Sequence, residues 1–113
     1  MIVSDFEKIL LESVDESLSH LGELCQRATY YYLEKGFNIR KYEIPHKIDE
    51  FTVAMEEIFS SGAEVLEIQI MKLLNDKVNQ TSELDYKQDN LEFTEYIKSI
   101  RRSFTSKKLK AAK

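Results

Sequence analysis

Apolar residues recur at intervals of three and four along most of the chain, the spacing that one face of an α-helix requires. Five segments show this pattern, at about residues 4–18, 21–36, 48–59, 61–78 and 89–106. No segment alternates apolar and polar residues over the length of a strand, and only three glycines and one proline are available for turns. We therefore predict an all-α fold, a compact helical bundle of four core helices followed by a C-terminal amphipathic basic helix.

Signals at the ends of these segments support the division. Ser4, Ser61 and Asp89 are each followed three positions later by a glutamate, the capping-box arrangement that begins a helix. Gly36 is expected to end the second helix, because glycine adopts the left-handed conformation of a helix C-terminus without strain. The sequence leaves open whether the first two helices meet in a kink or in a true turn near residues 19–22.

Two stretches without the helical pattern divide the chain. Residues 36–47 form the first connection, in which Pro45 cannot continue a helix and Ile39 and Ile44 are the expected inward anchors. Polar residues dominate the second stretch. We predict a helical core domain at 1–78, a polar linker at 79–88, and a basic amphipathic helix with its tail at 89–113.

Two of the predicted helices raise the question of a partner. The fourth is apolar on most of its circumference, so we expect it at the centre of the bundle or against a second subunit. The expected inward stripe of the second helix is Leu21, Leu24, Cys25, Ala28, Tyr31 and Tyr32. Three consecutive tyrosines cover nearly a full turn, so at least one ring must face away from the core. Either Tyr31 and Tyr32 pack inward with Tyr30 at the rim, or the cluster anchors an interface, with Tyr30 and Tyr31 as interaction residues.

The composition is that of one globular domain. The chain has 113 residues, 42% of them hydrophobic, which is too few residues for two domains. A single cysteine excludes a disulfide framework and a multi-thiolate zinc site within one chain. The N-terminal residues show no positive region followed by a long apolar run, so we expect no signal peptide, no membrane span and a cytoplasmic location.

The net charge of −4 hides an asymmetry along the chain. Residues 1–97 carry nine basic and 20 acidic side chains, a net charge of −11. Residues 98–113 carry a net charge of +7 with no acidic side chain, from Lys98, Arg101, Arg102, Lys107, Lys108, Lys110 and Lys113. An acidic body with a basic end indicates a partner of opposite charge, and the candidate contact residues are Lys98, Arg101, Arg102, Lys107 and Lys108.

The sequence contains no convincing catalytic, metal-binding or cofactor-binding pattern. Cys25 lies on an apolar stripe, where a thiol behaves as a small hydrophobic group. The one Glu-x-x-His match, Glu43 to His46, contains Pro45, so we do not expect it to form the helical turn that a di-iron bundle uses. The three glycines stand singly, so no phosphate-binding loop is present. We predict no enzymatic activity, no cofactor and no metal.

His20 is the remaining candidate for chemistry. It lies near a helix junction between Glu16 and Glu23, and an exposed histidine on a helical bundle could carry a phosphoryl group. No adjacent basic residue is present to steady such a group, so the favoured interpretation is a surface histidine and the phosphocarrier stays an alternative.

A set of core and turn residues carries a resemblance to a known family. The matching residues are Leu21-Gly22-Glu23, Tyr31-Tyr32-Leu33-Glu34-Lys35, Phe37-x-Ile39, Glu43-Ile44-Pro45, Glu50-Phe51, Ile58-Phe59, Gly62-Ala63, Leu66-Glu67 and Ile70. In these residues the segment from about 18 to 75 resembles a family of small archaeal helical domains, the output domains of Nitrosopumilus-type archaea. The resemblance implies a signalling or interaction role and supplies no catalytic residues.

These observations together predict a non-catalytic protein-interaction or signalling-output domain that associates with itself, and a second protein is the further candidate partner. The first alternative is binding of nucleic acid or of an acidic partner through the basic C-terminal helix. The second alternative is a phosphocarrier that uses His20.

Overall fold

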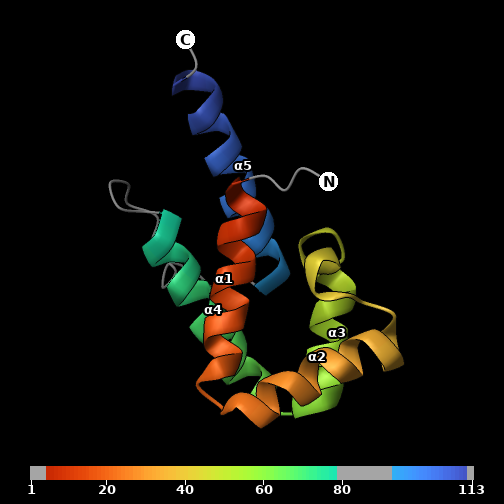
Figure 1. The fold of residues 1–113 in the computed structure, drawn as a ribbon. Coiled ribbons are helices and arrows are strands. Elements are labelled where there is room, and N and C mark those ends of the chain that lie inside the picture. Colours follow the sequence, from red (N-terminus) through yellow and green to blue (C-terminus); the bar gives the residue numbers. More distant parts are fainter. Residues whose placement is uncertain (1–4, 79–92, 112–113) are drawn as a thin grey trace.

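A computed structural model describes residues 5–78 and 93–111 of the chain, with side chains described as far as Arg102. The described residues form α-helices and one 3-10 helix and contain no strand, so the predicted all-α class is confirmed. The elements are α1 (Asp5–Ser19), α2 (Glu23–Phe37), η1 (Lys41–His46), α3 (Ile48–Phe59), α4 (Gly62–Val78) and α5 (Phe93–Ala111) (Figure 1). No helix in the described ranges is long and apolar enough to cross a membrane.

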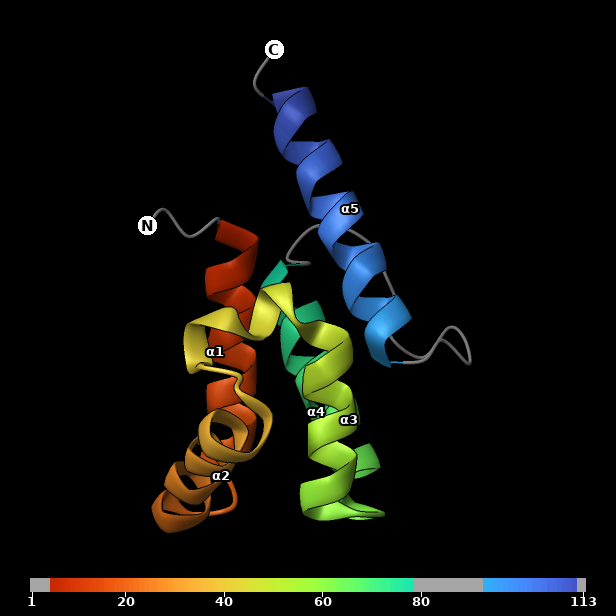
Figure 2. The ribbon, with the colours of Figure 1, turned by 90° about the vertical axis from the view of Figure 1, so that its right-hand side faces the viewer.

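The bundle is organised around α1 and α4, which pack more extensively on each other than any other pair of elements. They run in opposite directions, and α3 forms a hairpin with α4 (Figures 1 and 2). Helix α2 turns away at the end of α1 and lies across the lower end of the bundle as drawn (Figure 1). Among the described elements it packs on α1, α3 and η1, which lie on one side of it.

One hydrophobic core joins all the elements. Burial of apolar area, worth about 25 cal/mol per Å², is the main force that holds them together. The fully buried side chains with the largest volumes are Phe51, Leu10, Leu18, Leu33, Ile39, Ile44, Met55, Ile70, Leu74, Ile97, Ile100 and Val14. The expected inward anchors of the first connection, Ile39 and Ile44, are both confirmed by this burial.

The joint between α1 and α2 is a true turn. The chain passes through a hydrogen-bonded turn in which Leu21 N donates to Leu18 O and Gly22 N donates to Ser19 O, each at 3.0 Å. Gly22 has a φ of 102°, a conformation that side-chain-bearing residues rarely adopt. This glycine therefore allows α2 to leave the direction of α1 so sharply.

The far end of α2 differs from the prediction. Gly36 lies inside the helix, and Asn38 is the left-handed residue that ends it, with φ 57° and ψ 40°. Asparagine tolerates this conformation better than most residues, and Ile39 N then donates to Leu33 O at 2.9 Å. Helix α2 therefore extends one residue past Gly36, and Ile39, which follows the Asn38 cap, is buried. The predicted caps at Ser4 and Asp89 lie outside the described residues.

The expectation that Pro45 prevents a helical turn between Glu43 and His46 is wrong. Both lie in η1, where Pro45 is an interior residue. A six-residue 3-10 helix has few internal hydrogen bonds, so the missing proline N–H is tolerated. The start of η1 is held by Arg40 N, which donates to Glu43 Oε1 at 2.9 Å.

Helix α5 joins the core through its first two turns. Phe93, Tyr96, Ile97 and Ile100 are buried among the core residues, and Tyr96 Oη donates to Asn75 Oδ1 of α4 at 3.3 Å. Beyond these turns the helix extends away from the body (Figure 2). The division into a helical core domain at 1–78 and a basic amphipathic helix with its tail at 89–113 stays a prediction, and the linker predicted at 79–88 lies outside the described residues.

Candidate interaction surface

The side of α2 that faces the bundle is partly polar. Thr29 and Leu33 are its buried residues, with Tyr30 half-buried beside them. Thr29 Oγ1 donates to the carbonyl oxygen of Cys25 at 2.7 Å, so the buried hydroxyl is satisfied inside its own helix. Only one large aliphatic side chain of α2, Leu33, is therefore fully buried.

A carboxylate on α1 fixes the rotation of α2. Asp15 Oδ1 accepts hydrogen bonds from Tyr30 Oη at 2.9 Å, from Lys41 Nζ at 3.0 Å and from Gln26 Nε2 at 3.1 Å. Gln26 Nε2 also donates to the backbone oxygen of Asp15 at 2.9 Å. Lys41 Nζ also lies 5.0 Å from the centre of the Tyr30 ring, so this cation contacts both the Asp15 carboxylate and the tyrosine that donates to it.

The protonation states in this network support the geometry. Partial burial would by itself raise the pKa of Asp15, but the hydrogen bonds from Lys41 and Tyr30 outweigh it and hold the pKa of the carboxyl below its ordinary value. Burial, together with the neighbouring carboxylate, raises the pKa of Tyr30 well above its ordinary value. Asp15 is therefore ionised and Tyr30 keeps its proton at neutral pH, the combination that this hydrogen bond needs.

The predicted inward stripe of α2 is wrong, because most of it faces solvent. Leu24 is 79% exposed, Tyr31 60% and Tyr32 57%, and Leu21 and Ala28 are also exposed. We call these five residues the α2 outer face. The hydrogen bonds of Gln26 and Tyr30 to Asp15 turn the opposite side of the helix to the core, which leaves this apolar side outside. Cys25, expected inward, is half-buried at its edge.

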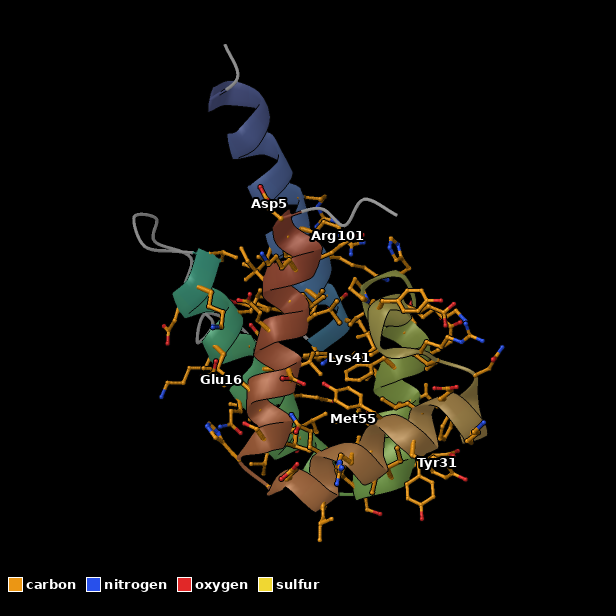
Figure 3. The ribbon with its side chains drawn as sticks, in the orientation of Figure 1. Asp5, Glu16, Tyr31, Lys41, Met55 and Arg101 are labelled. Atoms are coloured by element: carbon orange, nitrogen blue, oxygen red, sulfur yellow. The ribbon has the colours of Figure 1, made fainter. Side chains whose placement is uncertain are left out.

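The tyrosine cluster is divided between the two sides of the helix. Tyr31 points away from the bundle (Figure 3) and Tyr32 is also exposed, whereas Tyr30 is half-buried and donates to Asp15. The interpretation with Tyr30 at the rim and Tyr31 and Tyr32 packed inward is therefore wrong. The exposed rings of Tyr31 and Tyr32 contact each other edge to face, with centroids 5.9 Å apart. Of the two tyrosines predicted as interaction residues, only Tyr31 is accessible, and the prediction omitted Leu24 and Tyr32.

The basic residues at the start of α5 have partners within the chain. Lys98 Nζ lies 3.3 Å from Asp49 Oδ2 of α3. Arg101 Nη2 donates to the carbonyl oxygen of Pro45 at 2.8 Å, and the guanidinium carbon lies 5.2 Å from the centre of the Phe6 ring. These contacts join α5 to α1, α3 and η1.

The other predicted cations of α5 are Arg102, Lys107 and Lys108. Arg102 is exposed. The side chains of Lys107 and Lys108 lie outside the described part of the chain, although their backbone continues the helix away from the body.

The titratable side chains that could do chemistry are dispersed. His20 is exposed on the turn after α1, and its Nδ1 contacts the side-chain amide of Gln69 on α4. His46 Nε2 lies 3.0 Å from Glu7 Oε2. Within residues 5–78 and 93–111 no group of three or more histidine, cysteine, aspartate or glutamate side chains is arranged to hold a metal ion. Among the described residues, the side-chain contact of His20 is thus with an amide, and no described contact brings a basic side chain to its ring.

Glu67 on α4 is the one carboxyl that stands out. Its Oε2 atom is buried and, among the described residues, has no hydrogen-bond partner. Burial and then the charges of Glu56 and Glu64 raise the pKa of Glu67 to about 6. We call Glu56, Glu64 and Glu67 the acidic corner of α3 and α4, where like charges repel one another and the described contacts pair Glu67 with no cation.

Comparison with known proteins found no matching family model, no matching curated protein and no matching solved structure. The function is therefore inferred from this chain's own geometry, in which α2 carries more exposed large apolar side chains than any other described helix.

Proposed function

We propose that this protein is a non-catalytic protein-interaction domain and that its binding surface is the α2 outer face. The observation that carries the proposal is the exposure of Leu24, Tyr31 and Tyr32 on one side of a helix whose other side is fixed to the core. Contiguous exposed apolar side chains mark interaction sites on soluble domains, and tyrosine is enriched at such sites.

The rigidity of α2 supports this role. The network around Asp15 and the burial of Leu33 hold the helix from behind, so its outer face is preorganised. A preorganised surface loses less conformational entropy on binding than a flexible segment does. The resemblance to archaeal output domains also favours an interaction or signalling role, and it stays a prediction.

Affinity capture with a matched pair of variants tests the proposal. The double variant Leu24→Lys/Tyr31→Lys places two charges on the α2 outer face. The control Val53→Lys/Val65→Lys places two charges at exposed valines of α3 and α4. Both should melt like the unmodified protein. We expect the control to retain the proteins that the unmodified chain captures from a lysate of its source cells, and the α2 variant to lose them. Equal capture by both variants would contradict the proposal.

A second candidate function is favoured by a separate observation. Helix α5 extends beyond the body, and the chain has no acidic residue from Lys98 onward. We propose that this projecting half binds a polyanion, with nucleic acid as the first choice. Binding of a labelled duplex should weaken steeply with salt, because each neutralised phosphate releases counterions. It should weaken further in Lys107→Glu/Lys108→Glu. Salt-independent binding, or none, would remove this candidate.

A further inference from the structure

We infer that the occupant of the α2 outer face is a second copy of this chain, with the two α2 helices packed antiparallel across a two-fold axis. The inference rests on the proposed function and specifies its partner. It is drawn from the spacing of the exposed residues of α2, from their sizes and from the charges at their edges.

The exposed residues have the spacing of a coiled-coil seam. Leu24, Ala28, Tyr31 and Lys35 are separated by four, three and four residues, and all four are exposed. This is the alternation of the a and d positions in a heptad, over the two heptads that a 15-residue helix can hold. A helix that presents this seam to solvent matches a second helix that presents the same seam.

The sizes of the seam residues favour the antiparallel direction. Antiparallel pairing places Ala28 of each copy opposite Tyr31 of the other, so each layer joins one small and one large side chain. The outer layers place Leu24 opposite the methylene stem of Lys35. Parallel pairing would instead stack alanine on alanine and tyrosine on tyrosine, which gives layers of unequal thickness. Facing small and large residues fill an interface evenly.

The charges beside the seam favour the same direction. Arg27 and Glu34 are both exposed and lie seven residues apart on the same flank. In an antiparallel pair such flanking positions face each other, so Arg27 of each copy lies opposite Glu34 of the other, and the two-fold axis repeats the pair. In a parallel pair Arg27 would face the Tyr32 flank and no opposite charges would meet. The other flank of the antiparallel pair brings Cys25 of each copy opposite Tyr32.

The size of the surface sets the expected strength. A single helix of 15 residues is about 22 Å long. Its outer face offers less than the ~800 Å² per partner of a standard stable interface. We therefore expect a reversible dimer with a dissociation constant in the micromolar range, in exchange with the monomer at working concentrations.

Sedimentation analysis of the full chain between about 5 μM and 500 μM tests the inference, with charge reversals as the diagnostic variants. The unmodified chain should shift from the 13.3 kDa monomer to a dimer over this range. Arg27→Glu alone and Glu34→Lys alone should each dissociate at least tenfold more readily, because each places two pairs of like charges across the axis. An equimolar mixture of these two variants should form dimers of near-normal strength, because every facing pair in the mixed dimer is again of opposite charge.

Each outcome decides the inference. Failure of the mixture to recover dimerisation would overturn the antiparallel arrangement, as would a dimer that persists in Leu24→Lys/Tyr31→Lys. A monomer throughout the range would overturn self-association. If that monomer still captures other proteins in a manner that depends on Leu24 and Tyr31, the proposed function stands with a different partner. If capture is also independent of these residues, both fail.

Discussion

Helices α2 and α3 are neighbours of similar length that are held in opposite ways. The buried side of α3 is wholly apolar and includes Phe51 and Met55, both with no exposed surface. The buried side of α2 combines one leucine with Thr29 and Tyr30, which are satisfied by hydrogen bonds. Helix α3 therefore depends on packing, whereas α2 depends on packing and on one ionic network.

The difference shows why α2 keeps an apolar surface to spare. The hydrogen bonds to Asp15 determine which side of α2 faces the core. The α2 outer face, which holds more apolar residues than the core side, is therefore exposed to solvent. In α3 the only large apolar residue left well exposed is Val53. An apolar stripe that the fold does not use for its own core is available for another molecule.

The largest expected effect is at the apolar side of α3. Phe51→Ala should lower the free energy of unfolding by about 3–5 kcal/mol, because it leaves a cavity in a fully packed site. Val53→Ala, at a position 56% exposed on the same helix, should change it by less than ~0.5 kcal/mol. Urea unfolding followed by circular dichroism measures both. A small loss for Phe51→Ala would show that α3 is not held by packing.

Leu33 and Leu24 allow the buried and the exposed side of α2 to be compared within one helix. Leu33→Ala should cost about 2–4 kcal/mol, as for other buried leucines. Leu24→Ala should leave the stability of the monomer within ~0.5 kcal/mol of the unmodified chain. Denaturation at low micromolar concentration separates these values from any effect of association. Similar losses at both positions would mean that the outer side of α2 is part of the core.

The ionic network of α2 should contribute less than the core but should depend on pH. Asp15→Asn should cost about 1–2 kcal/mol at pH 7, since it weakens charge-assisted hydrogen bonds that are partly exposed. The folded pKa of Asp15 lies below its ordinary value of 3.8, so its contribution is complete above that value and is lost as the pH falls below it.

Chemical denaturation from pH 7 to pH 3 measures this dependence. The difference in the free energy of unfolding between the unmodified chain and Asp15→Asn should decrease as the pH is lowered toward 3. Glu16→Gln is the matched control on α1, because the Glu16 contact with Lys77 is exposed and should be worth ~0.5 kcal/mol or less. A gap that stays constant with pH would contradict the role of the Asp15 charge.

The smallest effect is expected at the acidic corner of α3 and α4, and it has the opposite sign. The folded pKa of Glu67, about 6, is raised above its ordinary value of 4.5, so the folded chain binds this proton more tightly than the unfolded chain. Stability is therefore lost as the pH rises from 4.5 through 6. Glu67→Gln should stabilise the protein at pH 8 by about 1 kcal/mol or less and have no effect near pH 4.

The same denaturation series run at pH 4 and pH 8 checks this prediction. Glu12→Gln, at an exposed position of α1, should show no such difference between the two pH values. If Glu67→Gln instead destabilises the protein at pH 8, the ionised carboxylate makes a favourable interaction in the folded chain and the expected repulsion is wrong.

The fold class and the positions of the five described α-helices could be predicted from apolar spacing, and the anchors Ile39 and Ile44 from their being the aliphatic residues of the first connection. The rotation of α2 could not, since Leu33 and Leu24 lie on opposite sides of the helix and either could have faced the core. Asp15 decides between them, and its partners Tyr30 and Lys41 are 15 and 26 residues away in the chain. Sequence spacing carries no signal for contacts of that kind. The contact of His20 with Gln69 was unpredictable for the same reason.

The pairing of α1 with α4 also has a consequence for synthesis of the chain. Helix α1 ends at Ser19 and its main partner ends at Val78, so 59 residues must be added before the pair can be complete. At translation rates of about 5–20 residues per second this takes ~3–12 s. For that interval the buried side of α1, which includes Leu10 and Val14, lacks the helix on which α1 packs most extensively. The nascent chain is therefore open to aggregation through an apolar stripe that is fully buried in the finished fold.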